Sequence, residues 1–206
     1  MSAKPSMQSA CERAVSPADG SDRVISSGPP RTVVDYESNG IYVTAAHYYA
    51  GEGYGAGLWR LDPSTGAATE IANGVPFEVL DHGIGWTDGG TIMTKSLIRF
   101  DLASRSQRQW GVSTDSGWAP FVGLDSKGNP LVDLQIFTTP TSGTLFVYAA
   151  PQSRRPIPSV AFDQLGVTDG HGTWLAGADG IYLLDANDKL MKVSNETGGA
   201  VAGGCN

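Results

Sequence analysis

The stretch LWRLDPSTG, residues 58–66, sets the pattern from which the fold can be predicted. A short run of strand-forming residues is followed by a polar turn. Related stretches lie at 97–105 (LIRFDLASR), 145–153 (LFVYAAPQS, a weaker version) and 181–189 (IYLLDANDK). The turn opens with an aspartate in three of the four: Asp62, Asp101 and Asp185. The first residues lie 39, 48 and 36 positions apart, and a repeat of about 40 residues built from short strands is the period of a propeller blade.

A second repeated element precedes each of these stretches. It reads DYESNGIYV, GWTDGGTIM, GLDSKGNPLV and VTDGHGTWLA, from residues 35, 85, 123 and 167. Each copy indicates a strand end, an acidic turn with a glycine that allows positive φ, and a new strand. The acidic residues that can accept hydrogen bonds from the turn amides are Glu37, Asp88, Asp125 and Asp169. Each repeat therefore contains four strands, a to d; in the first we expect them at 33–36, 41–49, 57–61 and 68–71.

The two ends of the chain complete the pattern. CERAVSPADGSDRVIS, from residue 11, aligns with the stretch that begins at residue 58 and predicts strands c and d of an incomplete blade. A strand from the C-terminal AVAGGCN can join them in a fifth, composite blade. That closure brings Cys11 near Cys205, and their disulfide would stabilise the fold by about 4–5 kcal/mol on the chain-entropy model. The alternatives are two free thiols, four blades with the N-terminal strands packed outside, or a fragment of a longer propeller.

The predicted domain organisation is a disordered tail at 1–9 and one all-β propeller domain at 10–206. Its repeats fall at 10–30 (partial), 31–75, 76–117, 118–161 and 162–198, with a closing strand at 199–206.

The repeats resemble those of streptogramin-lyase-type and NHL-like β-propellers. The similar segments are DGHGTWLAGADGIYLLDANDKLMKVS (169–194) and GLWRLDPSTGAATEI (57–71). The resemblance implies a propeller. Lyases of this type use a metal site with a closely spaced Glu and His, whereas Glu78 and His82 are four residues apart. The resemblance therefore does not extend to lyase activity.

Composition and charge narrow the functional classes. The chain has 21 acidic and 14 basic residues, a formal net charge of −7, and no basic cluster longer than Arg154-Arg155. These features argue against nucleic acid and anionic lipid as partners. No apolar run reaches membrane-spanning length, which argues against membrane insertion. The N-terminus lacks the apolar segment of a signal peptide, but the two cysteines favour an oxidising compartment. We therefore expect a monomer that is secreted, periplasmic or on the cell surface.

The candidate ligand-binding residues come from the connections between strands. In a propeller the b–c and d–a loops share one rim, and function concentrates on such loops. The stretches AAHYYAGEGYGAG (45–57), NGVPFEVLDHG (73–83), GVSTDSGWAPF (111–121) and SVAFDQ (159–164) belong to this loop-rich rim. They supply His47, Tyr48, Tyr49, Tyr54, Glu78, Asp81, His82, Trp118 and Phe162. Aromatic faces stack on sugars or cations, and carboxylates accept hydrogen bonds.

Three functions are compatible with this rim. We favour a binding module for a carbohydrate, a peptide or another small polar ligand, without a cofactor. The second is a metal-assisted lyase or hydrolase, in which His47, His82 and Glu78 would hold a divalent metal. The third is a domain that docks a protein partner. The glycines of 51–57 lead into a strand instead of a helix, so we predict no phosphate cradle there.

Overall fold

All regular elements of the described part of the chain are β-strands. The computed structural model describes residues 10–15, 22–28, 31–37, 40–45, 57–73, 79–90, 95–113, 120–135, 142–162 and 164–197. Within these ranges, no helix is long and apolar enough to cross a membrane. The all-β fold class is confirmed.

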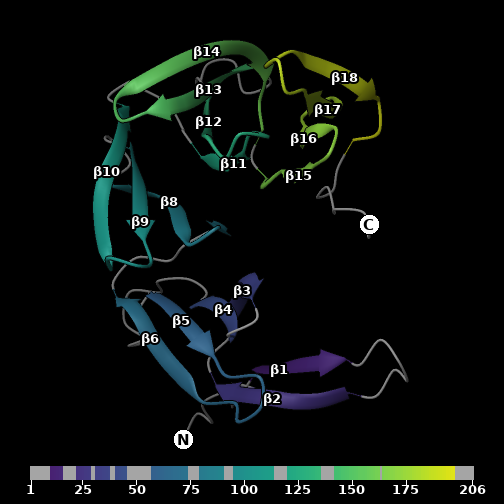
Figure 1. The fold of residues 1–206 in the computed structure, drawn as a ribbon. Coiled ribbons are helices and arrows are strands. Elements are labelled where there is room, and N and C mark those ends of the chain that lie inside the picture. Colours follow the sequence, from purple (N-terminus) through teal and green to yellow (C-terminus); the bar gives the residue numbers. More distant parts are fainter. Residues whose placement is uncertain are drawn as a thin grey trace, which may run out of the picture. The chain divides into compact units, whose positions relative to one another are not determined.

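Sixteen of the strands form four sheets of four, each a meander of consecutive strands (Figure 1). We call the sheets blades 1 to 4, because such a meander is the unit of a β-propeller. Blade 1 contains β3 (Arg31–Glu37), β4 (Gly40–Ala45), β5 (Gly57–Leu61) and β6 (Ala68–Asn73). Blade 2 contains β7 (Val79–Asp81), β8 (Ile84–Gly90), β9 (Lys95–Asp101) and β10 (Ser106–Ser113). Blade 3 contains β11 (Phe121–Leu124), β12 (Pro130–Gln135), β13 (Ser142–Ala150) and β14 (Ser153–Val160). Blade 4 contains β15 (Val167–Asp169), β16 (Gly172–Gly177), β17 (Gly180–Leu184) and β18 (Leu190–Ser194). The four predicted full repeats are confirmed.

The N-terminal strands β1 (Ala10–Val15) and β2 (Asp22–Gly28) pair antiparallel in a two-stranded sheet of their own. Residues 1–9 and 198–206 lie outside the described residues. The composite fifth blade, the Cys11–Cys205 disulfide and the domain boundaries therefore stay predictions.

The chain divides into two compact units. Unit 1 comprises residues 1–85 and 101–106, and unit 2 comprises residues 86–100 and 107–206. Blade 1 belongs to unit 1, blades 3 and 4 belong to unit 2, and the division passes through blade 2.

Aspartates build the tight turns as the repeat predicts. The carboxylate accepts a hydrogen bond from a backbone amide two or three residues later, with N–O distances of 2.7–2.9 Å. The aspartates that do so are Asp62, Asp101, Asp125, Asp169 and Asp185. These bonds satisfy amides that no strand neighbour can reach, and they hold the a–b and c–d turns in one conformation.

The a–b turn of blade 2 differs from the prediction. We expected it around Asp88, but β8 runs through that residue, and the turn is His82-Gly83. His82 has a φ of 46° and Gly83 a φ of 77°. Two consecutive left-handed residues match the twist of a two-residue hairpin, so the chain reverses there and the later Asp-Gly-Gly continues the strand.

The core of unit 2 lies between blades 3 and 4. Buried side chains from β11, β12, β13 and β14, together with Phe162, pack with others from β16 and β17. The cluster is Val122, Leu131, Leu145, Val147, Ile157, Phe162, Leu175 and Leu184. The two blades are also joined at Leu124, whose carbonyl oxygen accepts hydrogen bonds from Thr168 (2.9 Å) and Thr173 (2.7 Å). The shared core and these hydrogen bonds therefore fix blades 3 and 4 against each other, and with them the side chains of their turns.

Candidate functional site

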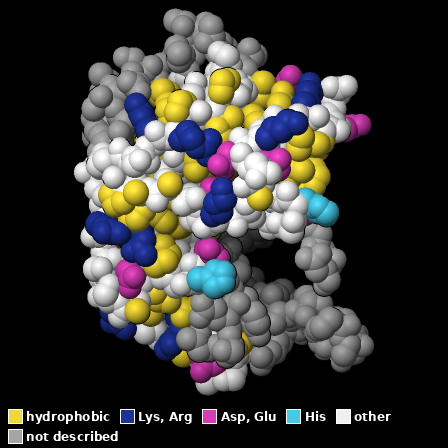
Figure 2. All heavy atoms as spheres, turned by 45° about the horizontal axis from the view of Figure 1, so that its top comes forward, with side chains coloured by type: hydrophobic (Ala, Val, Ile, Leu, Met, Phe, Trp, Pro, Cys, Tyr) yellow, Lys and Arg dark blue, Asp and Glu magenta, His cyan; other side chains and the backbone are white. Residues whose placement is uncertain are grey.

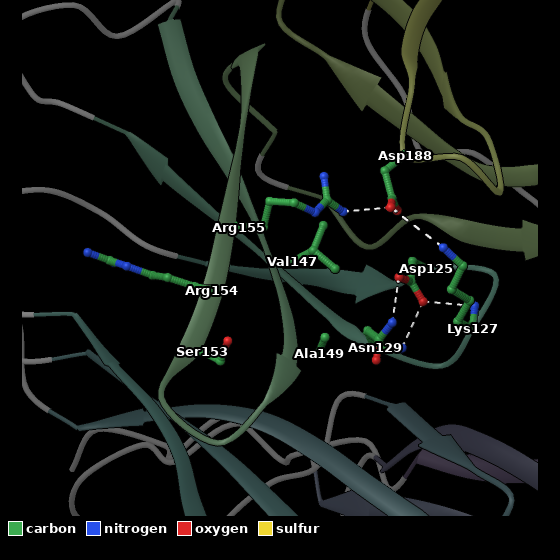
Figure 3. A pocket seen from close by; sticks show the side chains of 9 residues that line it. All are labelled: Asp125, Lys127, Asn129, Val147, Ala149, Ser153, Arg154, Arg155 and Asp188. Carbon is green, nitrogen blue, oxygen red and sulfur yellow. Dashed lines mark hydrogen bonds and ion pairs between the residues drawn. The ribbon is translucent and has the colours of Figure 1, made fainter.

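A polar pocket of about 210 Å³ lies at the turns of blades 3 and 4 (Figure 3). We call it the turn-end pocket. Its lining comes from the a–b turn of blade 3, the β13–β14 hairpin and the c–d turn of blade 4, all within unit 2. The lining residues are Asp125, Lys127, Asn129, Val147, Ala149, Ser153, Arg154, Arg155 and Asp188. Val147 and Ala149 give the pocket an apolar base, and its other seven lining residues are polar or charged, so it suits a small ligand with a charged group.

The first wall is the a–b turn of blade 3, which Asp125 holds in place. Asp125 is buried; its Oδ1 accepts the backbone amides of Lys127 and Asn129, both at 2.8 Å. Its Oδ2 accepts the side-chain amide of Asn129, also at 2.8 Å. The hydrogen bonds fix the backbone from which the Lys127 side chain reaches the pocket. Asp125 therefore positions Lys127 through the backbone of the turn.

The opposite wall is Asp188, in the c–d turn of blade 4. Its φ is 63°, a left-handed conformation that aspartate tolerates better than most residues. The amide of Asp188 donates to the carbonyl oxygen of Asp185 at 2.9 Å. The Asp185 carboxylate accepts the amides of Asn187 and Lys189, both at 2.9 Å. The turn thus fixes the position from which the Asp188 carboxylate faces blade 3.

Two cations of blade 3 converge on this one carboxylate. Oδ2 of Asp188 lies 2.7 Å from the Arg155 guanidinium and 3.6 Å from Lys127 Nζ. The side chain of Asp188 is only 20% exposed, whereas those of Arg155 and Lys127 are 49% and 53% exposed. The lysine contact is long, so Lys127 is the less tightly held cation.

The side chains of the adjacent residues Arg154 and Arg155 lie on opposite faces of β14. Figure 3 shows Arg155 directed toward Asp188 and Arg154 directed away from the pocket. Alternation is what a β-strand imposes on neighbouring side chains. The guanidinium carbon of Arg154 lies 4.3 Å from the centroid of the Phe146 ring on the other face. Both arginines line the turn-end pocket, but of the two only Arg155 pairs with Asp188.

Asp81 and His82 lie at the a–b turn of blade 2, away from the d–a connection where we predicted them. Neighbouring side chains of an extended strand point apart, but His82 Nδ1 lies 2.7 Å from Asp81 Oδ1. They meet because His82 adopts the left-handed turn conformation, which breaks the alternation of an extended strand. The His82 side chain is 93% exposed. The pair is therefore an exposed feature of the a–b turn of blade 2.

Phe162 is a core residue, which corrects its assignment to the ligand-binding rim. Its side chain is fully buried and packs edge-on against Tyr182, with ring centroids 5.5 Å apart. Phe162 also forms an isolated β-bridge with Gly177. A ring with no exposed surface cannot stack on a ligand. The short stretch SVAFDQ did not reveal this burial, because the covering residues come from blade 4.

The other predicted site residues lie outside the described residues. They are His47, Tyr48, Tyr49, Tyr54, Glu78 and Trp118, together with the disulfide partner Cys205. Nothing is described of the Cys11 side chain either.

A buried carboxylate that the sequence did not single out anchors the connection between blades 3 and 4. Asp133 is fully buried, and its Oδ2 accepts the amide of Phe162 at 2.8 Å. Its Oδ1 accepts the Ser159 hydroxyl at 3.3 Å. Gln135 Nε2 donates to the carbonyl oxygen of Phe162 at 2.8 Å. Both backbone groups of Phe162 are thus held by side chains of β12, which positions the start of this connection.

Asp179, in the b–c turn of blade 4, forms a separate polar cluster with Tyr182 and Lys192. The hydroxyl of Tyr182 donates to Asp179 Oδ1 at 2.8 Å, and Lys192 Nζ donates to Oδ2 at 3.0 Å. The hydrogen bond from Tyr182, followed by that from Lys192, lowers the pKa of Asp179. Burial, and then the hydrogen bond to Asp179, raises the pKa of Tyr182 to about 12.

An alkaline titration tests this arrangement. We expect the Tyr182 phenol to ionise near pH 12, and its pKa to fall in Asp179→Asn while staying above 10, because burial remains. A raised folded-state pKa means that the group's contribution to stability is complete below about pH 10 and is lost between about pH 10 and 12. The measurement is the difference in phenolate absorbance between the wild type and Tyr182→Phe. A difference spectrum with a midpoint near 10 would contradict the described contact.

Within the described ranges, no group of three or more His, Cys, Asp or Glu side chains is placed to hold a metal ion. His47 and Glu78, two members of the predicted metal set, lie outside those ranges.

Comparisons with known proteins place the chain in no family. No family model and no curated protein matches it. Among solved structures it is similar to TolB from Acinetobacter baumannii, with 14% sequence identity and a TM-score of 0.49. The match covers 87% of this chain and 48% of TolB, so the chain spans about half the length of that protein. With identity and TM-score this low, the function is inferred below from the residues of this chain alone.

Proposed function

We propose that this protein is a recognition module that binds the carboxylate of a peptide or small organic acid in the turn-end pocket. The observation that carries the proposal is the convergence of Lys127 and Arg155 on Asp188 across a recess of about 210 Å³. A carboxylate that enters the recess meets Lys127, whose contact with Asp188 is long, and the donor edge of Arg155. A guanidinium has five N–H donors, so Arg155 can hold Asp188 and a second carboxylate together.

The pocket contains a carboxylate, Asp188, beside its two cations. It therefore also favours a ligand that carries a positive charge close to its own carboxylate. The Asp188 carboxylate is fixed by its turn, and an ammonium group on the ligand can share it with Arg155. Ser153 adds a hydroxyl at the same wall. A preorganised set of this kind reduces the ordering cost of binding. This chemistry fits a peptide or amino acid better than a neutral sugar.

The aromatic residues of the loop-rich rim are a second proposed surface for the same function. The support is the sequence alone: His47, Tyr48, Tyr49 and Tyr54 fall on one connection, and Trp118 on another. Their ligand would be a glycan, a peptide or another small polar molecule. We further propose an extracytoplasmic, monomeric protein; the metal-assisted lyase and the protein-docking domain remain the alternatives.

A thermal-shift comparison tests the turn-end pocket. A short peptide with a free C-terminal carboxylate is compared with the same peptide as a C-terminal amide. At about 100 times the dissociation constant, binding to the folded state adds about 2.7 kcal/mol. In a chain of this size that raises the melting temperature by roughly 5–10 °C. We expect the acid to give this shift and the amide to give a much smaller one.

Two single-charge variants locate the effect. Lys127→Gln should abolish most of the shift, because it removes the exposed cation of the pocket. Lys192→Gln removes the same charge from a lysine that pairs with Asp179 outside the pocket, and it should leave the shift unchanged. Equal shifts for acid and amide, or equal loss in both variants, would refute the pocket as the site. A shift that disappears only in a Tyr48→Ala/Trp118→Ala variant would instead support the loop-rich rim.

A further inference from the structure

The turn-end pocket holds charges of both signs close together. Oδ2 of Asp188 lies 2.7 Å from the Arg155 guanidinium and 3.6 Å from Lys127 Nζ. A second carboxylate, that of Asp125, also lines the pocket. In the view of Figure 2, Lys and Arg side chains likewise lie beside Asp and Glu side chains on the described surface. A simple anion that enters the pocket therefore meets carboxylates as well as cations.

Repulsion from Asp188 weakens the binding of a simple anion. A ligand carboxylate held by Arg155 lies beside the Asp188 carboxylate, because the same guanidinium binds both. The side chain of Asp188 is only 20% exposed, so water screens the repulsion incompletely. A positive charge on the ligand at this place replaces the repulsion by an attraction. The pocket thus favours a ligand whose ammonium group lies next to its carboxylate.

Asp188 is positioned to receive that ammonium group. Both of its ion pairs use Oδ2, and the two oxygens of a carboxylate offer about four acceptor sites. Figure 3 shows the Asp188 carboxylate between Arg155 and Lys127. The c–d turn of blade 4 holds the residue through its amide, which donates to the carbonyl oxygen of Asp185 at 2.9 Å. The acceptor is therefore in place before a ligand arrives, which lowers the ordering cost of binding.

The spacing of the charges defines the ligand more closely. In an α-amino acid a single carbon separates the nitrogen from the carboxyl carbon, and these two atoms lie about 2.5 Å apart. The opposite charges of the pocket are adjacent in the same way, at 2.7 and 3.6 Å. At a peptide C-terminus the corresponding nitrogen is an amide and carries no charge. A free α-amino acid therefore matches the pocket better than the last residue of a peptide does.

The size and the base of the pocket favour a small side chain on this ligand. A volume of about 210 Å³ corresponds to about seven water molecules, or to roughly as many non-hydrogen atoms of a ligand. The base is formed by Val147, which is buried, and by Ala149, which is exposed. A short apolar side chain can rest on these two residues while the charged groups of the ligand face the turns.

We propose that the turn-end pocket binds a free α-amino acid with a small side chain. Its ammonium group is received by Asp188, its carboxylate by Arg155 and Lys127, and its side chain by Val147 and Ala149. The inference rests on the proposed function, because it assigns the ligand carboxylate to the same two cations. It goes further in requiring a positive charge on the ligand next to that carboxylate.

Isothermal titration calorimetry at low ionic strength, with L-alanine and three analogues, tests the proposal. N-acetyl-L-alanine keeps the carboxylate but lacks the ammonium group, and it should bind at least about tenfold more weakly than L-alanine. L-alaninamide keeps the ammonium group but lacks the carboxylate, and it should also bind at least about tenfold more weakly. β-Alanine has one more methylene between its charges and should bind about threefold or more weakly.

An Asp188→Asn variant tests the ammonium receptor. Asparagine tolerates the left-handed conformation of this residue, whose φ is 63°, so the turn should stay intact. L-alanine should bind at least about tenfold more weakly to the variant, whereas N-acetyl-L-alanine should bind as well as to the wild type or better, because the repulsion is gone. Asp179→Asn is the matched control, since Asp179 pairs with Lys192 outside the pocket. It should change both affinities by less than about twofold.

An Ala149→Leu variant tests the apolar base. Ala149 is exposed, so the larger side chain does not disturb the core. It occupies the space of the ligand side chain and should weaken L-alanine about threefold or more, but glycine by less than about twofold. Equal weakening of the two amino acids would remove the base from the proposed site. Far-ultraviolet circular dichroism and melting curves verify that each variant is folded.

The outcomes separate this inference from the proposed function. Equal binding of L-alanine and N-acetyl-L-alanine to the wild type would overturn the inference and leave carboxylate recognition standing. Absence of L-alanine binding, with the melting shift by the peptide acid retained, would have the same meaning. If neither L-alanine nor the peptide acid bound, the proposed function would fail as well. Equal loss of L-alanine binding in Asp188→Asn and Asp179→Asn would also overturn the inference, because the effect would then not depend on the pocket.

Discussion

Replacement of Asp133 by alanine is expected to lower the free energy of unfolding by about 3 kcal/mol. The fully buried carboxylate accepts the Phe162 amide at 2.8 Å and the Ser159 hydroxyl at 3.3 Å. Without it, a buried N–H loses its partner and a small cavity remains. The position is crowded as well as polar, because a Cβ added at Gly143 would lie 2.6 Å from Asp133 Oδ1.

Two further variants separate the effect of the lost hydrogen bonds on stability from the effect of the lost side-chain volume. Asp133→Asn keeps the size and one acceptor oxygen, so the loss should be smaller than in Asp133→Ala. Ser159→Ala removes only the longer hydrogen bond and should cost less than about 1 kcal/mol. Urea denaturation measures all three. A loss below about 1 kcal/mol in Asp133→Ala would show that the carboxylate does not anchor this connection.

Gly172→Ala is expected to destabilise the protein by about 3 kcal/mol or more. Gly172 follows the a–b turn of blade 4 with a φ of 140°, a conformation open to glycine and rarely to other residues. An added Cβ would also overlap the carbonyl oxygen of Leu184 on the neighbouring strand β17. Strain and overlap act together, and neither can relax without shifting the β16–β17 pair.

Gly170 in the same turn provides the matched control. A Cβ added there meets nothing within 4 Å. Gly170→Ala should therefore change the free energy of unfolding by less than about 1 kcal/mol. Thermal or urea unfolding of the two variants measures the contrast. Similar stabilities for Gly170→Ala and Gly172→Ala would contradict the described backbone of this turn.

The tight turns of the fold could be predicted from the sequence, because each turn is determined by residues within the turn itself. The turn aspartates at 62, 101, 125, 169 and 185 bind amides within four residues, so their spacing carries the whole signal. The blade 2 turn was misplaced for a related reason. Asp88-Gly89-Gly90 imitates a turn, whereas the actual reversal at His82-Gly83 depends on two left-handed residues. Histidine is a less obvious residue for that conformation than Asn or Asp.

The candidate site depends on contacts between repeats and could not be predicted in the same way. Lys127, Arg155 and Asp188 come from two blades and meet only when these blades pack. The one signal in the sequence was the Arg154-Arg155 pair, which is unusual in an acidic chain, but nothing local indicates that its members serve opposite faces. The burial of Phe162 is equally non-local, because its cover comes from Tyr182 and Gly177 of blade 4.

The central claim is that the protein recognises a carboxylate in the turn-end pocket. The most direct test is a ¹H–¹⁵N correlation titration of the labelled protein with the acid form of the peptide. The account predicts that the largest shift changes fall on the amides of Lys127, Asn129, Ser153, Arg155 and Asp188, and that they disappear with the C-terminal amide. Changes confined to other residues, such as those of the His47–Tyr54 connection, would contradict it.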